Sequence, residues 1–191
     1  MAGERHYVSR SALLNTRRDQ VGKSNGVIEI REESPDDIAA IREVNRLAFG
    51  QGLEGQVVDA LRANGGVLLS LVAVSDGKIV GHILYSPAVV GAFRGAALGP
   101  MAVLPDYQRQ GLGSQLVTTG NRRIGEAGHP FVIVLGHPQF YPRFGFTPAS
   151  ARSIRCQWDV PDDVFMVLIL DSTKTEGMTG LAQYRSEFSM V

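Results

Sequence analysis

Hydrophobic and polar residues follow two different periods along the chain, and the change of period separates helices from strands. Apolar residues recur at every third or fourth position in three stretches, which predicts helices over residues 35–49, 54–63 and 112–126. Short apolar or alternating runs rich in β-branched residues predict strands between the helices. The predicted strands cover residues 27–31, 67–74, 79–85, 96–103, 131–135, 153–157 and 165–171, and an aromatic helical turn is expected over 140–144.

Several of these elements begin or end at a local signal. Residues 34–37 (Ser-Pro-Asp-Asp) have the form of a capping box, with a proline in the first helical turn and acidic side chains facing the helix dipole. The Asp-Gly pair at residues 76–77 is typical of a tight turn and predicts a hairpin between the second and third strands. Pro87 is expected to end the third strand.

The order of the elements predicts a mixed α/β sheet with helices on its faces. The strand-helix-strand unit over residues 96–135 should be a right-handed parallel crossover, whereas the hairpin before it is antiparallel. A chain of 191 residues has the size of one domain, so residues 27–191 are expected to form a single domain. Residues 1–26 are basic and lack a long apolar period, and they are expected to form a disordered tail.

Charge and residue usage argue against several classes of protein. The 19 Lys and Arg residues balance the 19 Asp and Glu residues, so the composition does not favour a nucleic-acid partner. The longest apolar run, residues 164–170, is too short to cross a membrane. The single cysteine cannot form an internal disulfide, which favours a cytoplasmic location, and the four histidines lack a metal-ligand spacing, so no metal site is expected.

The strongest candidate for a binding site is residues 98–114, where a strand leads through a turn into a helix. Free N–H groups at the start of a helix, together with the helix dipole, form a site for phosphate anions. Gly111 and Gly113 allow the backbone to approach an anion, and Arg109 can add a charge-assisted hydrogen bond. The competing interpretation is an ordinary strand-to-helix turn in which the glycines serve only packing.

Two blocks of the sequence resemble a known family. The run Gln-Arg-Gln-Gly-Leu-Gly at residues 108–113, after a Val-Leu-Pro strand end, resembles the acetyl-coenzyme A signature of the GCN5-related N-acetyltransferase (GNAT) superfamily. Residues 134–146 resemble the strand and aromatic helix of its YhbS-like branch of predicted N-acetyltransferases, and residues 80–87 and 184–188 agree with this branch. The resemblance covers roughly residues 27–188 and leaves out only the basic tail.

The resemblance implies a GNAT-type fold, which is a mixed, mostly antiparallel sheet with a splayed pair of parallel strands and helices on both faces. The gap between the parallel strands would admit the pantetheine arm of acetyl-coenzyme A, pairing with main-chain groups of Met101 and Val103 as an added strand does. The competing interpretation makes these two only core residues. The expected cofactor-binding residues are Met101, Ala102, Val103, Arg109, Gln110, Gly111, Leu112, Gly113 and Ser114.

The resemblance also points to catalytic residues. Tyr141 would stabilise the departing thiolate through a hydrogen bond, because full proton transfer from a phenol to a thiolate runs uphill at ordinary pKa values. Glu54 is the first candidate for the general base, acting through water, and His82 is the second. Each of the three has a structural alternative. Tyr141 could be part of an aromatic cluster, Glu54 a solvated helix-cap carboxylate and His82 a structural residue of its strand.

Together these expectations describe an acetyl-coenzyme A-dependent N-acetyltransferase in which a primary amine attacks directly within a ternary complex. No acyl-cysteine step is needed, so Cys156 is taken as a core residue. A non-catalytic acyl-coenzyme A-binding or sensing module of the same fold is the alternative. The acceptor is expected to be a small-molecule or peptide amine, with a protein terminus, a lysine or an aminoacylated RNA as further alternatives, and the late strands are compatible with a homodimer.

Overall fold

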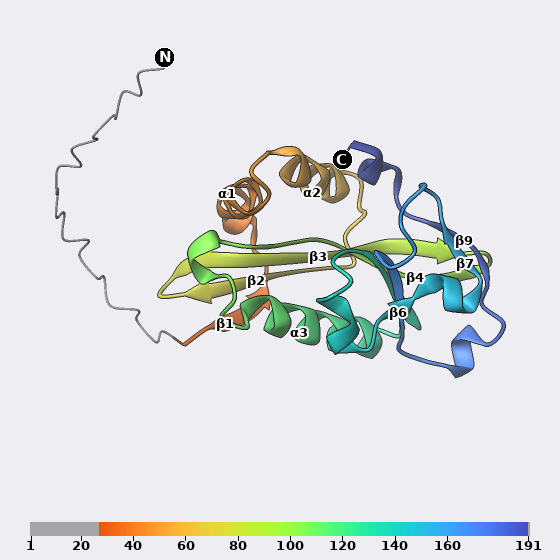
Figure 1. The fold of residues 1–191 in the computed structure, drawn as a ribbon. Helices are drawn as coiled ribbons and strands as arrows, with labels where there is room; N and C mark the ends of the chain where they lie inside the picture. The colour runs from red at the N-terminus through yellow and green to blue at the C-terminus, as the bar shows by residue number, and fades with distance from the viewer. Residues whose placement is uncertain (1–26, 191) are drawn as a thin grey trace, which may run out of the picture.

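Within residues 27–190, which the computed structural model describes, a nine-stranded β-sheet runs through the middle of the molecule (Figure 1). The predicted tail over residues 1–26 lies outside the described residues. The strands are β1 (Glu29–Glu32), β2 (Leu69–Ser75), β3 (Lys78–Val90), β4 (Phe93–Val103), β5 (Phe131–Leu135), β6 (Thr147–Pro148), β7 (Ile154–Cys156), β8 (Phe165–Ile169) and β9 (Gly180–Gln183). They follow the order β1-β2-β3-β4-β5-β8-β6, and β9 pairs with both β3 and β7.

Helices cover both faces of the sheet (Figure 1). α1 (Ile38–Phe49) and α2 (Leu53–Ala63) lie on one face, and α3 (Leu112–Glu126) lies on the other. No helix in the described range is long and apolar enough to cross a membrane. Short 3-10 helices are η1 (Pro35–Asp37), η2 (Pro105–Tyr107), η3 (Tyr141–Phe144), η4 (Ala149–Arg152), η5 (Thr173–Thr175) and η6 (Ser186–Met190).

The predicted fold class is confirmed: the sheet is mixed and mostly antiparallel. β2 and β3 form the predicted antiparallel hairpin, with positive φ angles at Asp76 (49°) and Gly77 (75°) in its turn. β4 and β5 are parallel and are connected through α3, and the short β7 and β9 form a second parallel pair. α3 and β5 have the predicted bounds, and the capping box is present, since the Ser34 N–H donates to the Asp37 carboxylate at 2.7 Å.

The prediction that Pro87 ends a strand was wrong, because β3 continues through it to Val90. The Leu68 N–H donates to the Tyr85 carbonyl, so the main chain of Tyr85 faces β2. Main-chain groups two residues apart point to the same side of a strand, so the nitrogen of Pro87 also points toward this side. β2 begins at Leu69, opposite Tyr85, so no β2 residue lies beside Pro87. The N–H that Pro87 lacks therefore removes no hydrogen bond of the sheet.

The sequence prediction also misplaced or missed strands at one end of the sheet. β4 starts at Phe93 instead of residue 96, because its first residues pair with the extended end of β3. Neither β6 nor β9 was predicted from the sequence. β9 pairs with β3 at only two positions and with β7 at three. The formation of this strand therefore depends on strands that are distant in sequence.

A glycine fixes how closely α3 approaches the sheet. A Cβ atom on Gly120 would lie 2.4 Å from the Tyr85 ring, so this helix position accepts no side chain without a shift. Tyr85 is fully buried, and its hydroxyl donates to Oδ1 of Asn121 at 2.9 Å. Gly120 therefore lets α3 lie directly on β3, the strand beside β4. This contact helps to set the position of the start of α3 relative to β4.

Candidate active site

β4 and β5 separate after a short parallel contact. They pair over only three residues, 96–98 on β4 and 132–134 on β5. Beyond this contact the register between β4 and β3 shifts around residues 99–100, which is a β-bulge, and a bulge bends its strand. Residues 101–103 of β4 have no pairing with β5, so the predicted gap between the two parallel strands is present.

The main-chain groups on the open side of β4 belong to Met101 and Val103. The Leu104 N–H donates to the Val80 carbonyl at 2.9 Å, so Leu104 turns its main chain toward β3. Because the direction alternates along a strand, the N–H and C=O groups of Met101 and Val103 point the other way, toward the gap. They are free to pair with an extended ligand, except that the Val103 carbonyl accepts a hydrogen bond from the side chain of Gln108 at 2.9 Å.

Ala102 is a correction to the predicted cofactor-binding set. It lies opposite His82 in the β3–β4 ladder, and by the same alternation its main chain faces β3 instead of the gap. Its side chain is buried as well. Ala102 therefore holds β4 in the sheet and offers no group to a ligand in the gap.

The N-terminus of α3 is open to solvent beside this gap. Gly111 is the N-cap with φ of 85°, and Arg109 before it has φ of 60°. The first bond of the helix runs from the Gln115 N–H to the Gly111 carbonyl at 3.0 Å, so the preceding N–H groups have no partner within the helix. Arg109 and Gly111 are exposed, so this end of the helix presents free N–H groups to an anion.

Gly113 brings the helix N-terminus close to the gap. A Cβ atom built on it would meet Sδ of Met101 and the ring of Phe140, both at 3.6 Å. Met101 also lines the cavity described next. The anion site and the cavity are thus joined through a single side chain of β4.

A cavity of about 510 Å³, called the central cavity below, lies between the start of α2 and the separated ends of β4 and β5. Volumes of this size are typical of small-molecule sites. Its walls come from α1, α2, β4, β5 and the segment after β5, together with the C-terminal part of the chain. They are formed by Phe49, Glu54, Val57, Leu98, Gly99, Pro100, Met101, Leu135, Gly136, His137, Tyr141, Trp158, Val160, Tyr184 and Phe188.

Tyr141 lies in the central cavity, in the position that the sequence motif suggested. Its ring packs edge-on against Phe140 and Phe146, with centroid distances of 5.1 and 5.5 Å, and it covers the main chain of Gly136. Burial raises the pKa of Tyr141 above its ordinary value of 10.0. The phenol therefore stays protonated in the neutral range, so it can act as a hydrogen-bond donor. The aromatic cluster of the competing interpretation is also present and holds the ring in place.

Glu54 also lies in the central cavity, in the first turn of α2. The side-chain amide of Gln51 donates to its Oε1 at 3.0 Å. Its Oε2 is buried and has no hydrogen-bond partner among the described residues. A buried carboxylate oxygen without a partner is costly, so this atom is a ready acceptor for a donor that enters the cavity.

His82 lies in the core and not in the central cavity, so the structure does not bring it together with Tyr141 and Glu54. Burial lowers its pKa to about 3, which keeps the imidazole neutral. The Asn45 side-chain amide lies 3.2 Å from Nδ1, so Nδ1 accepts and Nε2 carries the proton toward Ser70 at 3.0 Å. Ser70 in turn donates to Glu33. His82 therefore connects α1 to two strands, and its candidate role as general base is withdrawn.

Comparison with known proteins identifies the family. Residues 67–148 match the model of the acetyltransferase (GNAT) domain. The chain is 36% identical over 163 residues to the uncharacterized N-acetyltransferase YhbS of Escherichia coli strain K12. The match covers 84% of this chain and 98% of the relative. The protein belongs to the GNAT acetyltransferase family. The N-acetyltransferase resemblance seen in the sequence is confirmed.

Solved structures agree with this GNAT assignment. The crystal structure of YhbS from E. coli in complex with CoA has a TM-score of 0.82 and 32% sequence identity, covering 96% of both chains. A GNAT family acetyltransferase from Brucella melitensis, solved in complex with acetyl-CoA, has a TM-score of 0.71 and 34% identity, covering 85% of this chain and 99% of that one. As a GNAT member the protein is an N-acetyltransferase.

Most of the wall of the central cavity lies outside the GNAT motifs. Phe49 ends α1, Trp158 and Val160 lie in the loop after β7, and Tyr184 and Phe188 lie after β9. The only signal for any of them was the family resemblance at residues 184–188. Their spacing carries no period, because they come from three separate segments of the chain. In the described part of this GNAT chain, no three His, Cys, Asp or Glu side chains are grouped so that they could hold a metal ion.

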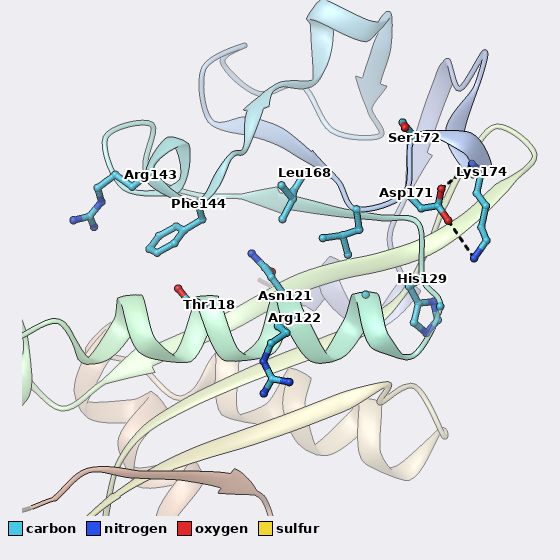
Figure 2. A pocket seen from close by; sticks show the side chains of 13 residues that line it. Thr118, Asn121, Arg122, His129, Arg143, Phe144, Leu168, Asp171, Ser172 and Lys174 are labelled. Carbon is cyan, nitrogen blue, oxygen red and sulfur yellow. Dashed lines mark hydrogen bonds and ion pairs between the residues drawn. The ribbon is translucent and has the colours of Figure 1, made fainter.

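A second hollow lies on the α3 face, between α3, η3 and β8 (Figure 2). Its volume is about 790 Å³, and it shares no lining residue with the central cavity of the GNAT fold. Two of its cations are neutralised locally, Lys174 by Asp171 at 3.3 Å and Arg122 by Glu126 at 2.6 Å. Figure 2 shows the first of these pairs at the end of the hollow near His129.

Arg143, at the other end of this hollow, is a cation that the sequence analysis did not single out. No carboxylate among the described residues forms an ion pair with it, and its guanidinium lies over the Phe140 ring at 4.6 Å from the centroid. Figure 2 shows its side chain extending toward the N-terminal end of α3. Because Phe140 also borders Gly113, Arg143 adds positive charge near the anion site of the GNAT motif.

Proposed function

We propose that the protein transfers the acetyl group of acetyl-coenzyme A to a primary amine, by direct attack of the amine within a ternary complex. Acetyl-coenzyme A-dependent acetyl transfer follows from membership of the family; the amine acceptor and the order of events are the proposal. The observation that carries it is the gap between β4 and β5, which leads from the exposed N-terminus of α3 to a cavity that holds Tyr141 and Glu54.

The first part of the proposal is how the donor is held. The main-chain N–H groups of residues 109–114 bind the pyrophosphate, and the helix dipole supports them. The main chains of Met101 and Val103 pair with the amides of the pantetheine arm, which extends β4 sideways as an added strand does. Arg143 contributes a charge-assisted contact to the phosphates. This arrangement directs the thioester into the central cavity.

The second part is the chemistry of transfer. The amine nitrogen forms a bond to the thioester carbon while the carbon–sulfur bond breaks, and the sulfur leaves as a thiolate. Tyr141 donates a hydrogen bond to that sulfur, which stabilises the charge that develops on it. The ammonium group of the bound amine first gives a proton to Glu54, which passes it to solvent, and the neutral amine then attacks. Glu54 also accepts the proton that the nitrogen loses as the amide forms. A main-chain N–H of β4 at the gap faces the carbonyl oxygen.

Two measurements test this proposal. Titration calorimetry should detect binding of acetyl-coenzyme A, and a thiol-release assay with a panel of amines should detect release that depends on the amine. Tyr141→Phe should lower turnover by about 100-fold with little change in acetyl-coenzyme A affinity, because the ring stays and only the donor is lost. Release of thiol without any dependence on an amine would contradict the transfer. The cytoplasmic location and the homodimer stay predictions.

A further inference from the structure

The walls of the central cavity carry few charged groups. Of its fifteen lining residues, Glu54 is the only carboxylate, and none is a lysine or an arginine. The other titratable groups are the exposed His137 and two tyrosines whose pKa values burial raises. The remaining wall is aliphatic or aromatic, apart from the two glycines, and includes Phe49, Trp158 and Phe188.

The one charge in the central cavity is placed to meet a cation. Oε2 of Glu54 is buried without a partner, while Oε1 is held by Gln51 at 3.0 Å. An ammonium group that donates to Oε2 would satisfy this oxygen and form a charge-assisted hydrogen bond, which is roughly twice as strong as a neutral one. A ligand carboxylate in the same place would face Glu54 with no lysine or arginine in the cavity wall to pair with it.

The far wall of the cavity is held in a fixed position by hydrogen bonds and ring contacts. The Tyr184 N–H donates to the Gln157 side chain at 2.8 Å, and the Tyr184 ring lies 5.1 Å from Trp158. Glu187 accepts hydrogen bonds from Asn64, which directly follows α2, at 2.9 Å and from Arg185 at 2.7 Å. These contacts fasten the C-terminal segment against the end of α2, so this wall of the cavity is held in place. The cavity volume of about 510 Å³ is that of a small-molecule site.

We infer that the acceptor is a small primary amine whose ammonium group binds Glu54 and whose body is aromatic or aliphatic, without a carboxylate beside the amine. The inference rests on the proposed function and narrows it. The body occupies the apolar wall around Trp158 and Phe188, where burial of apolar surface favours binding. Free amino acids are rejected, because their carboxylate would be buried next to Glu54 without a cation.

The test uses pairs of amines that differ in one carboxylate. 2-Phenylethylamine is compared with L-phenylalanine, and pentylamine with L-norleucine, by amine-dependent thiol release from acetyl-coenzyme A. L-Phenylalaninol is the control for bulk at the same carbon. The amine of each pair should have a kcat/KM about 100-fold above that of the amino acid, because an unpaired buried charge is costly. The alcohol should behave like the amine. Calorimetry on the coenzyme A-saturated protein should rank the affinities in the same order.

Variants of Glu54 separate this inference from a general effect on the cavity. Glu54→Gln should reduce the preference for phenylethylamine over phenylalanine by about tenfold or more in the calorimetric affinities, because both the attraction to the ammonium and the repulsion of the carboxylate are lost. Glu54→Asp keeps the charge and should keep most of the preference. The affinity ratio is the readout, so it does not depend on whether Glu54 also acts as the base.

Two results would overturn the inference while the proposed function stands. One is equal use of the amino acid and the amine in both pairs. The other is acetylation confined to polyamines, peptide N-termini or lysine side chains, with none of the apolar amines accepted. By contrast, acetyl-coenzyme A binding without thiol release for any amine in the whole panel would count against the proposed transfer itself.

Discussion

Replacing Gly136 with alanine should slow catalysis by moving Tyr141. The ideal Cβ atom at this position lies 2.1 Å from Cε2 of the Tyr141 ring, whereas 3.4–4 Å is ordinary van der Waals contact. The backbone of Gly136 does not require glycine, since its φ is not positive, so the effect of the substitution comes from the close contact with the ring. The ring or the backbone must therefore shift by about 1 Å, and a misplacement of that size can lower a rate by about 100-fold.

The assay is steady-state thiol release with acetyl-coenzyme A and an accepted amine, accompanied by a thermal melt. For Gly136→Ala, kcat should fall by about 100-fold, and the cost in folding stability should be about 1–3 kcal/mol for overpacking. Gly125→Ala is the matched control, because a Cβ there meets only Leu170 at 3.7 Å and the site is on α3, outside the central cavity. This control should keep wild-type kcat.

A double-mutant cycle with Tyr141→Phe tests the cause of the loss. If Gly136→Ala acts by displacing the Tyr141 hydroxyl, it should cost little more in the Tyr141→Phe background, where that hydroxyl is already absent. The reasoning is refuted if Gly136→Ala keeps wild-type kcat in a folded protein. Full additivity of the two losses would also refute it, because the two changes would then act on different steps.

Three further predictions concern the anion site, the C-terminal segment and the packing of α3. Arg143→Gln should weaken coenzyme A binding by about three- to tenfold in calorimetry at low salt, and the loss should shrink at high salt; a salt-independent loss or none contradicts the phosphate contact. Contacts with Arg185 and Asn64 lower the pKa of Glu187 from 4.5 to about 2, so its contribution to stability is present above pH 4.5 and is lost as the pH falls toward 2. Urea unfolding of wild type and Glu187→Gln should therefore differ at pH 7 and converge in acid, and a constant difference would count against this. Gly120→Ala should lower the free energy of unfolding by about 1–3 kcal/mol, because its Cβ would lie 2.4 Å from buried Tyr85, and a neutral result would show that Tyr85 can move freely.

The parts of this protein that sequence could predict depend on chemistry within a few residues. A glycine at residue 111 with positive φ, free N–H groups at the start of α3 and a tyrosine just after β5 follow from short motifs, and the structure contains each of them. The capping box before α1 and the Asp-Gly hairpin are predictable for the same reason, because neighbours along the chain supply all of their hydrogen bonds.

The errors arose where the answer depends on distant parts of the chain. Pro87 predicts a strand end from sequence alone, yet β3 continues through it to Val90. The proline is tolerated because β2 begins only opposite Tyr85 and leaves no partner beside Pro87. The ordinary pKa of a histidine suits a general base. Burial of His82 under α1 lowers its pKa to about 3, so its imidazole is too weak a base for that role. Ala102 lies in the predicted motif, and only the register with β3 shows that its main chain faces the wrong side.

The sequence by itself determined the fold class, the family and the glycine-containing start of α3 with its free N–H groups, because each is specified by local motifs in a fixed order. Only the tertiary structure decided which side chains line the central cavity and that one oxygen of Glu54 is buried there without a partner. The physical reason is that burial and hydrogen-bond partners are properties of packing. Phe49, Glu54, Trp158 and Phe188 meet only because α1, α2 and the C-terminal segment fold over the gap between two separated strands.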